Sequence, residues 1–412
     1  MKKIIILLLT AIMSVAAYAQ TDVPDKNGLL KKIRSLNSRR KQLNQQKDYS
    51  GSLDCLLQMQ KLMDSVFVAG DNNEESLKGK RAVQATLFYD IACTYSLLNK
   101  RKLAIDAFEA SIQAGFNDYR HVLNDTDLDN LRKEKRFTKL VSSLRKYDKL
   151  VILQEAKGYR KENTDTMPTF TYRTDDINLR NLHEYFKLDS VAGTGDEVSK
   201  IKNILAFVHN AIRHDGSNYA LCEVDAIDIY NYHKATGRGV NCRLLAIALN
   251  EMYLSMGFAS RYVTCLPKDS TDGDCHVINT VYSRQINKWI WVDPTFNAYV
   301  MDENGNLLSI AEVRERLRTG QPLVLNETAN WNNQEKETKE HYLDYYMAKN
   351  LYWMQCVVDS RFNPESRYRP LESRYVTLVP EGAEQELSRR IFTPKYIVHD
   401  PEYFWQLPVS YK

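Results

Sequence analysis

Residues 237–249 read GRGVNCRLLAIAL, and this stretch decides the fold around it. Gly237 and Gly239 mark a loop, and the apolar run that starts at Leu244 has the composition of a buried helix. Cys242 is therefore predicted to lie at a helix N-terminus. Unpaired backbone N–H groups and the positive end of the helix dipole stabilise a thiolate at such a position, whereas an isolated thiol stays mostly protonated near neutral pH.

Two later stretches carry a histidine and an aspartate. His276 opens the run HVINTVY at 276–282, and Asp293 lies near the end of the run KWIWVDP at 288–294. Both runs predict strands, and residues 283–287 predict the turn between them, so a hairpin sets Asp293 beside His276. Taken singly, the three residues fit a buried thiol, a hydrogen-bonded histidine and a turn-starting aspartate. Taken together, they favour a nucleophilic site.

The ordered set of cysteine helix, histidine strand and WVDPT stretch at 291–295 resembles the transglutaminase-like superfamily, a branch of the papain-like cysteine enzymes. The resemblance covers roughly residues 165–305. It implies an α+β fold in which the nucleophile helix packs on an antiparallel sheet. It also implies Cys242 as nucleophile, His276 as base and acid, and Asp293 as the group that orients the imidazole.

The sequence departs from this family at two points. Many members have an aromatic residue soon after the histidine, whereas Val277 and Ile278 follow it here. Papain-like enzymes often carry a glutamine oxyanion donor shortly before the cysteine, and no glutamine stands in the loop before Cys242. The backbone N–H of Cys242 can supply one oxyanion donor, and the second is unassigned.

At 412 residues the chain is long enough for two or three domains. Residues 1–19 have the layout of a cleavable signal peptide, with Lys2 and Lys3, the apolar run 4–9, and small residues before a cut after Ala19. The mature protein is expected to be periplasmic or secreted, without a membrane anchor. Loss of the two lysines lowers the formal charge from +4 to +2, which predicts binding to neither nucleic acid nor anionic membranes.

Residues 20–145 are expected to form a helical region. Within it, residues 87–112 resemble a tetratricopeptide repeat, whose small and aromatic positions match Ala92, Tyr95, Ala104, Phe108 and Ser111. An isolated repeat is not stable, so this hairpin must pack on neighbouring helices.

Asp125, Asp127 and Asp129 have the spacing of the first ligands of a calcium loop. Asn130 and Arg136 stand where that loop needs a glycine and a glutamate, which excludes an EF-hand.

The catalytic domain is expected over 146–310, followed by a C-terminal α/β extension, 311–412, packed on it. The aromatic residues Tyr403, Phe404 and Trp405 of this extension fit core packing better than a binding cleft. His209 and His214, on or just beyond a predicted helix that starts near Asp196, are expected to be structural. His233 precedes the cysteine loop and is left open.

Seven cysteines in an oxidising setting raise the question of disulfides. Cys265 and Cys275 flank a polar loop between two predicted strands, so a disulfide and two separate thiols are both open. Cys55 and Cys93 lie in neighbouring helical segments and are equally undecided.

These observations favour an exported cysteine-nucleophile enzyme that acts on an amide bond through a thioester, with hydrolysis preferred. No cofactor is expected, and no metal, because no cluster of histidine, cysteine and acidic residues has ligand spacing. The expected substrate is a peptide or protein, and the N-terminal helices offer a surface for a protein partner. The alternatives are an amine-accepting transglutaminase and a binding protein with a silent triad.

Overall fold

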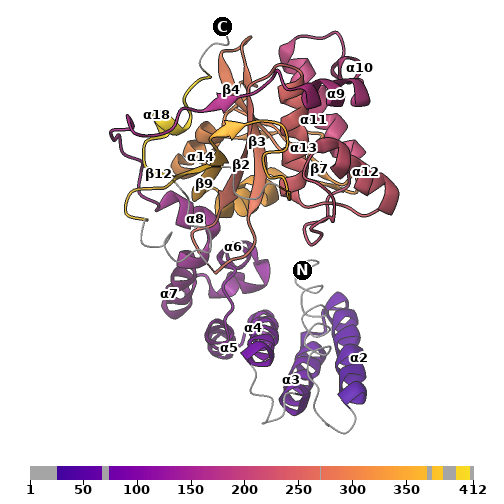
Figure 1. Cartoon of the computed structure of the whole chain (residues 1–412). Coiled ribbons are helices and arrows are strands. Elements are labelled where there is room, and N and C mark those ends of the chain that lie inside the picture. The colour runs from indigo at the N-terminus through magenta and orange to yellow at the C-terminus, as the bar shows by residue number, and fades with distance from the viewer. Residues whose placement is uncertain (1–25, 67–73, 270, 369–373, 384–395, 409–412) are drawn as a thin grey trace. The chain divides into compact units, whose positions relative to one another are not determined.

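The structure is a computed structural model that describes residues 26–66, 74–269, 271–368, 374–383 and 396–408. The predicted signal peptide, 1–19, lies outside the described residues. The chain forms two compact units, with the boundary between Asp148 and Lys149. The predicted α+β class is confirmed: an N-terminal helical unit precedes a unit in which helices pack on a sheet (Figure 1).

The N-terminal unit is built from helices. They are α2 (Lys26–Gln45), α3 (Tyr49–Val66), α4 (Glu74–Leu97), α5 (Arg101–Gln113), α6 (Tyr119–Asn124), the 3-10 turn η1 (Thr126–Leu131), α7 (Lys135–Leu144) and the 3-10 turn η2 (Arg145–Tyr147). In the hairpin of α4 and α5, Ala92, Ala104 and Phe108 are fully buried. Small side chains allow the two helices to approach, and the phenylalanine ring fills the remaining space.

The second unit contains longer helices that position the site and short ones that connect strands. They are α8 (Lys149–Gln154), α9 (Ile177–Phe186), α10 (Leu188–Ala192), α11 (Glu197–Ala211), α12 (Ala226–Thr236), α13 (Cys242–Ser255), α14 (Ile310–Thr319), α15 (Lys339–His341), a π-helical turn η3 (Tyr342–Met347), α16 (Ala348–Asn350) and α18 (Pro401–Phe404). Asp196 caps α11 by accepting a hydrogen bond from the Ser199 N–H, as its position before an apolar stripe predicts.

A six-stranded sheet with the order β12-β11-β9-β2-β3-β4 runs through this unit. Its strands are β2 (Ser260–Leu266), β3 (His276–Ser283), β4 (Lys288–Val292), β9 (Trp353–Val357), β11 (Tyr375–Leu378) and β12 (Tyr396–Val398). All neighbours are antiparallel except β11 and β12. The segment after 310 therefore completes the sheet, because it supplies β9, β11 and β12.

The remaining strands are short pairs outside this sheet. They are β1 (Thr171–Tyr172) with β10 (Asp359–Ser360), β5 (Val300–Met301) with β6 (Val324–Leu325), and β7 (Asn330–Trp331) with β8 (Glu335–Lys336).

The sheet is buried on both faces. Val277, Val281 and Val292 pack with the helices α11 and α13 in one core cluster. Ile278 and Trp291, which alternate with them, pack with α14 and η3 in a second cluster. Alternate side chains of a strand point to opposite faces, so two buried faces require nearly continuous apolar runs.

The sequence favours one aromatic-rich helix over 338–356, and this interpretation is wrong at its C-terminal end. The helical segment ends at Asn350, and β9 begins at Trp353 and pairs with β2. A short apolar run fits a buried strand and a buried helix equally well, and here pairing along the sheet decides between them.

The C-terminal aromatic residues pack in the core, as predicted. Phe404 is fully buried, and the buried guanidinium of Arg261 lies over the rings of Phe170, at 4.4 Å, and of Phe404 and Trp405, both at 5.8 Å. Cation–π contacts of this kind let an arginine sit in an apolar interior.

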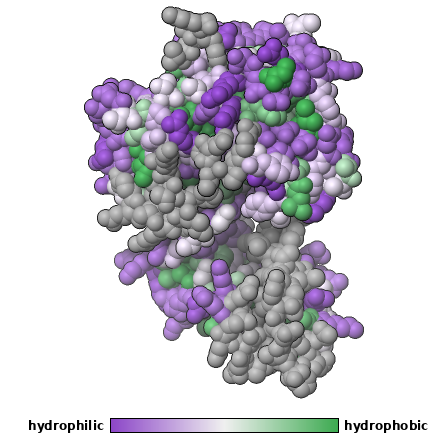
Figure 2. Space-filling view, viewed as in Figure 1, coloured by the Kyte–Doolittle hydropathy of each residue, from purple (hydrophilic) through white to green (hydrophobic). Residues whose placement is uncertain are grey.

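The visible face of the described residues is largely hydrophilic, with apolar groups in small patches (Figure 2). Within the described ranges, no helix combines the length and apolar character that a membrane span needs.

Candidate active site

Cys242 is the first residue of α13, as the sequence predicts. Asn241 caps the helix, since its side chain accepts a hydrogen bond from the Leu244 N–H at 3.1 Å. The Cys242 side chain is only partly exposed, while the helix behind it is buried from Leu244 to Leu254. The fold thus holds a rigid helix start with its sulfur at the edge of the core.

His276 and Asp293 meet at the end of the sheet near which this helix begins. His276 starts β3, and Asp293 directly follows β4, so the hairpin brings the two side chains together. The distance from His276 Nε2 to Asp293 Oδ2 is 2.6 Å, and the side chains are 1% and 0% exposed. The Thr295 N–H donates to the other carboxylate oxygen at 2.8 Å. Because Nε2 of His276 contacts Asp293, Nδ1 is the imidazole nitrogen that points away from the carboxylate.

The local environment changes the pKa of both reacting groups. Burial alone would raise the Cys242 pKa, but hydrogen bonds from His214 and His276, the charge of His276 and the Val277 N–H together lower it to about 6. Burial would lower the His276 pKa, but the charge and hydrogen bond of Asp293, together with Cys242, raise it to about 10. Both shifts favour the thiolate and imidazolium forms of the pair near neutral pH.

The imidazole of His276 lies between two aromatic side chains. Its centroid is 5.7 Å from that of Phe296 and 5.1 Å from that of Tyr346. Apart from the Cys242 thiol, the buried Nδ1 has no hydrogen-bond partner among the described residues. The aromatic residues supply from elsewhere in the chain the apolar wall that the sequence lacks immediately after the histidine.

Tyr342 is a site residue that the sequence analysis missed. Its hydroxyl donates to Asp293 Oδ2 at 2.6 Å, the same oxygen that contacts His276, and the Trp291 indole N–H donates to the hydroxyl at 3.3 Å. Tyr342 and Tyr346 both lie in η3, a π-helical turn of the kind often found at functional sites. The cluster of tyrosines at 342–346 was the available signal, but it gave no indication of the fold position.

His214 also differs from its prediction as a purely structural residue. It lies beside the Cys242 thiol and contributes to the lowered thiol pKa. Its ring also accepts a hydrogen bond from Trp331, at 3.1 Å. The sequence gave no signal for this role, because no motif links His214 to a cysteine 28 positions later.

The other two histidines considered have structural contacts. His209 bridges the Pro294 carbonyl at 3.0 Å and the Asn330 side chain at 2.9 Å, and so ties α11 to the segment after Asp293. His233 contacts the Arg238 carbonyl at 2.9 Å and stabilises the turn after α12.

An ion pair anchors the start of α13 beside the nucleophile. Arg243 donates to both oxygens of Glu365, at 2.7 and 2.6 Å, and to Thr264 on β2 at 3.0 Å. The hydroxyls of Tyr262 and Tyr375 also donate to Glu365. Bidentate pairs of this type fix orientation as well as distance.

The disulfides that the sequence left open are not formed. No bond joins Cys265 to Cys275 or Cys55 to Cys93 in the described structure. Cys265 is a buried thiol on β2, and burial raises its pKa well above the ordinary value. It is therefore chemically unlike Cys242.

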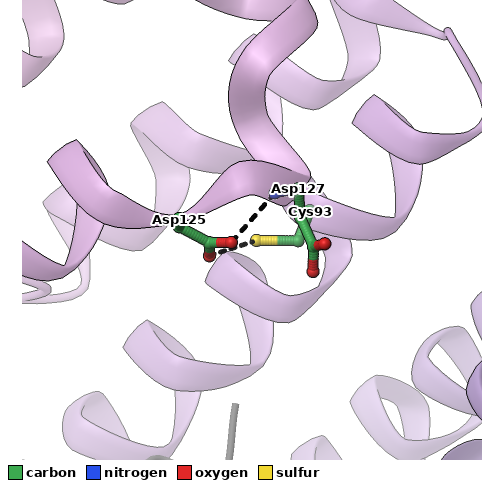
Figure 3. Close-up of side chains that lie close together, drawn as sticks. All are labelled: Cys93, Asp125 and Asp127. Atoms are coloured by element: carbon green, nitrogen blue, oxygen red, sulfur yellow. Dashed lines mark hydrogen bonds between the residues drawn. The ribbon is translucent and has the colours of Figure 1, made fainter.

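Cys93, Asp125 and Asp127 form one group of ligand-type atoms within 4.8 Å of one another in the described part of the N-terminal unit. Figure 3 shows the Cys93 thiol directed at Asp125, to which it donates at 3.5 Å. Asp125 also accepts from the Tyr89 hydroxyl and from the Asp127 N–H. The Cys93 thiol and the Asp125 carboxylate thus have hydrogen-bond partners within the protein.

Three comparisons with known proteins found similarities, and the family match lies in the second unit. A family model described as the transglutaminase-like superfamily matches residues 185–294, somewhat over a quarter of the chain. A stretch of 68 residues, 16% of this chain, is 35% identical to a chloroplastic protein of Arabidopsis thaliana and spans 19% of that protein. A solved structure of a proposed cysteine protease from Cytophaga hutchinsonii is similar at 16% identity and a TM-score of 0.22, over 39% of this chain and 51% of that chain.

The matches to the chloroplastic protein and to the solved structure cover less than two thirds of those proteins, and the TM-score of the solved structure is low. Neither match therefore bears on the chemistry of this protein. The family match spans the segment that holds all three predicted site residues. Residues 185–294 therefore form a transglutaminase-like domain.

Proposed function

We propose that this protein is a cysteine-nucleophile enzyme that attacks an amide carbonyl and passes through a thioester, with Cys242, His276 and Asp293 as its catalytic triad. One observation carries the proposal. A thiol at a helix start, with its pKa lowered to about 6, adjoins an imidazole whose pKa is raised to about 10 by a buried carboxylate. Perturbed values of this size, shared between adjoining groups, are characteristic of catalytic pairs.

The chemistry follows from the two protonation states. The thiolate of Cys242 attacks the carbonyl carbon, and the oxyanion that forms is stabilised by N–H groups near the helix start. The imidazolium of His276 then protonates the leaving amine, and a thioester remains on the sulfur. The neutral imidazole next activates the acceptor, while Asp293 keeps Nδ1 oriented toward the reacting atoms.

Water as acceptor gives hydrolysis of a peptide or similar amide, which we favour. An amine as acceptor gives a transglutaminase. Incubation of casein with a labelled primary amine, using wild type and Cys242→Ala, separates the two. New casein fragments without label indicate hydrolysis, and labelled casein indicates transfer. Either product with the Cys242→Ala protein contradicts the assignment of the nucleophile.

We also propose that the protein acts after export, on the basis of the signal-peptide pattern in residues 1–19. Its substrate is then a peptide or protein outside the cytoplasm, and the N-terminal helices are available for a protein partner. Processing after Ala19 is tested by N-terminal sequencing of protein recovered from the periplasm or medium.

A further inference from the structure

The main chain fixes His214 beside the loop that leads to Cys242. A parallel bridge pairs His214 with Val240, in which the Asp215 N–H donates to Val240 O at 2.7 Å and the Val240 N–H donates to Arg213 O at 2.9 Å. Gly239 permits this approach. A Cβ at that position would lie 2.8 Å from the carbonyl carbon of His214 and 2.9 Å from Arg213 O. His214 is thus held next to a residue only two positions before the nucleophile.

A second set of contacts holds the peptide groups of His214. Its N–H donates to Asn332 Oδ1 at 2.8 Å, and its carbonyl accepts from Asn332 Nδ2 at 3.0 Å. Asn332 follows β7, so the short hairpin β7–β8 holds the His214 backbone through these two hydrogen bonds. Together with the bridge to Val240, they restrict the movement of the His214 backbone near the site.

Trp331 determines which nitrogen of His214 carries the proton. Its indole N–H donates to His214 Nδ1 at 3.1 Å. Because an indole nitrogen can only donate, Nδ1 is the unprotonated nitrogen and the imidazole proton is on Nε2. Nε2–H is therefore the donor that the His214 ring has free of Trp331, and the ring lies close enough to Cys242 to lower the thiol pKa by hydrogen bonding.

The two imidazoles next to the sulfur have different capacities. His276 has Nε2 at Asp293 and can take and return a proton at Nδ1. In His214, Nδ1 accepts the hydrogen bond from Trp331 and Nε2 carries the ring proton. His214 is consequently a fixed hydrogen-bond donor, which is what a developing negative charge requires.

We propose that the Nε2–H of His214 is the second oxyanion donor of the site and that Trp331 acts as the positioning residue that keeps it a donor. The inference deepens the proposed function and rests on it. The Cys242 sulfur forms a bond to the substrate carbonyl carbon, and the carbonyl π electrons move to the oxygen. That oxygen accepts hydrogen bonds from the Cys242 N–H and from His214. When the oxyanion collapses, the C–N bond breaks and the amine leaves with the proton of His276.

Two model reactions separate a residue that donates to the thiolate from one that donates to the oxyanion. Iodoacetamide is attacked at a saturated carbon, with iodide leaving, so no oxyanion forms. The ester p-nitrophenyl acetate is attacked at a carbonyl, so an oxyanion does form, and p-nitrophenolate is released as the thioester is made. Both rates depend on the thiolate fraction, but only the second depends on oxyanion donors.

The experiment measures both rates at Cys242 across pH in wild type, His214→Ala, His214→Gln and Trp331→Phe. Each rate is compared on the plateau where the thiol of that variant is fully ionised. Cys242→Ala gives the background from other cysteines, and His233→Ala is the matched histidine control. On the plateau, His214→Ala is expected to slow acylation by about 10²- to 10³-fold with little change in alkylation. The amide donor of His214→Gln restores part of the loss, and Trp331→Phe gives a smaller loss in the same direction.

Two results would overturn the proposal. Equal losses in both reactions that disappear on the plateau would make His214 a donor to the thiolate only, and unchanged rates would give it no role at the sulfur. If His214→Ala does not fold, the ratio of the two rates in His214→Gln and Trp331→Phe decides the question. Failure of the proposed function is distinct, since wild-type Cys242 would then resist alkylation below pH 7 before any variant is compared.

Discussion

Tyr342 donates a hydrogen bond to Asp293 Oδ2, the same carboxylate oxygen that contacts His276 Nε2, and both contacts are 2.6 Å long. The tyrosine comes from a π-helical turn and the aspartate from the end of a strand, 49 residues earlier. Two donors thus hold one oxygen of the carboxylate, and Tyr342 itself is buried in the second core cluster.

Tyr342→Phe keeps the ring and removes this donor. Since hydrogen bonds to charged groups contribute about 1.5–3 kcal/mol, the free energy of unfolding of the second unit is expected to fall by about that amount. Urea unfolding followed by tryptophan fluorescence measures the change. Tyr345→Phe, in the same turn but with an exposed side chain, is the control and should be neutral. An equal effect of the two substitutions would contradict the role of Tyr342.

Asp293→Asn removes the charge that raises the His276 pKa while keeping the shape of the side chain. The imidazolium then loses its main stabilising partner and lowers the Cys242 pKa less strongly. The midpoint of Cys242 ionisation is expected to move from about 6 toward about 8.5, the ordinary value of a thiol. Thiolate absorbance in the ultraviolet, corrected with Cys242→Ala, measures the midpoint. An unchanged midpoint would mean that Asp293 has no influence on the pair.

Gly239→Ala tests whether the loop before Cys242 needs a close main-chain approach. The new methyl group would meet backbone atoms of residues 213 and 214, which cannot move away as a flexible side chain does. Overpacking of this kind costs about 1–3 kcal/mol, and the displaced His214 should also slow acylation. Gly273→Ala is the matched control, because a Cβ there meets nothing within 4 Å. Similar thermal stability of the two variants would argue against a tight contact at Gly239.

Glu365→Gln leaves the guanidinium of Arg243 without its charged partner in a partly buried site, where the two side chains are 31% and 19% exposed. Breaking a fully buried pair on one side costs about 3 kcal/mol or more, and partial exposure reduces the expected loss to about 2 kcal/mol. The comparison is Glu315→Gln, which breaks the more exposed pair of Glu315 and Arg318 and should change stability by less than about 1 kcal/mol. Thermal or urea unfolding of both variants checks the difference, and a larger effect at Glu315 would reverse the expected order.

The nucleophile helix and the histidine–aspartate hairpin could be predicted because local patterns encode them. The loop glycines and the apolar run predict the start of α13, and two strands joined by a short turn predict the meeting of His276 and Asp293. Asp196 before an apolar stripe likewise predicts the start of α11. In each case the decisive residues lie within a few positions of one another or across a single turn.

The remaining site residues could not be predicted, because tertiary contacts alone bring them to the triad. His214 depends on a bridge to Val240 and on a hairpin more than a hundred residues later. Tyr342 depends on how a π-helical turn packs on the end of β4. The strand β9 could not be predicted for the same reason, because its apolar run forms a strand only through pairing with β2.

The most direct test of the central claim is the pH dependence of Cys242 alkylation by iodoacetamide in wild type and His276→Ala, with the modified residue located by mass spectrometry. A lowered thiol pKa means that the thiolate is present above about pH 6, and a raised imidazole pKa means that the imidazolium persists up to about pH 10. The account predicts a wild-type rate that rises with a midpoint near pH 6, and a midpoint in His276→Ala that moves up toward that of an ordinary thiol. A wild-type Cys242 that is inert, or that titrates like an ordinary thiol with or without His276, would contradict it.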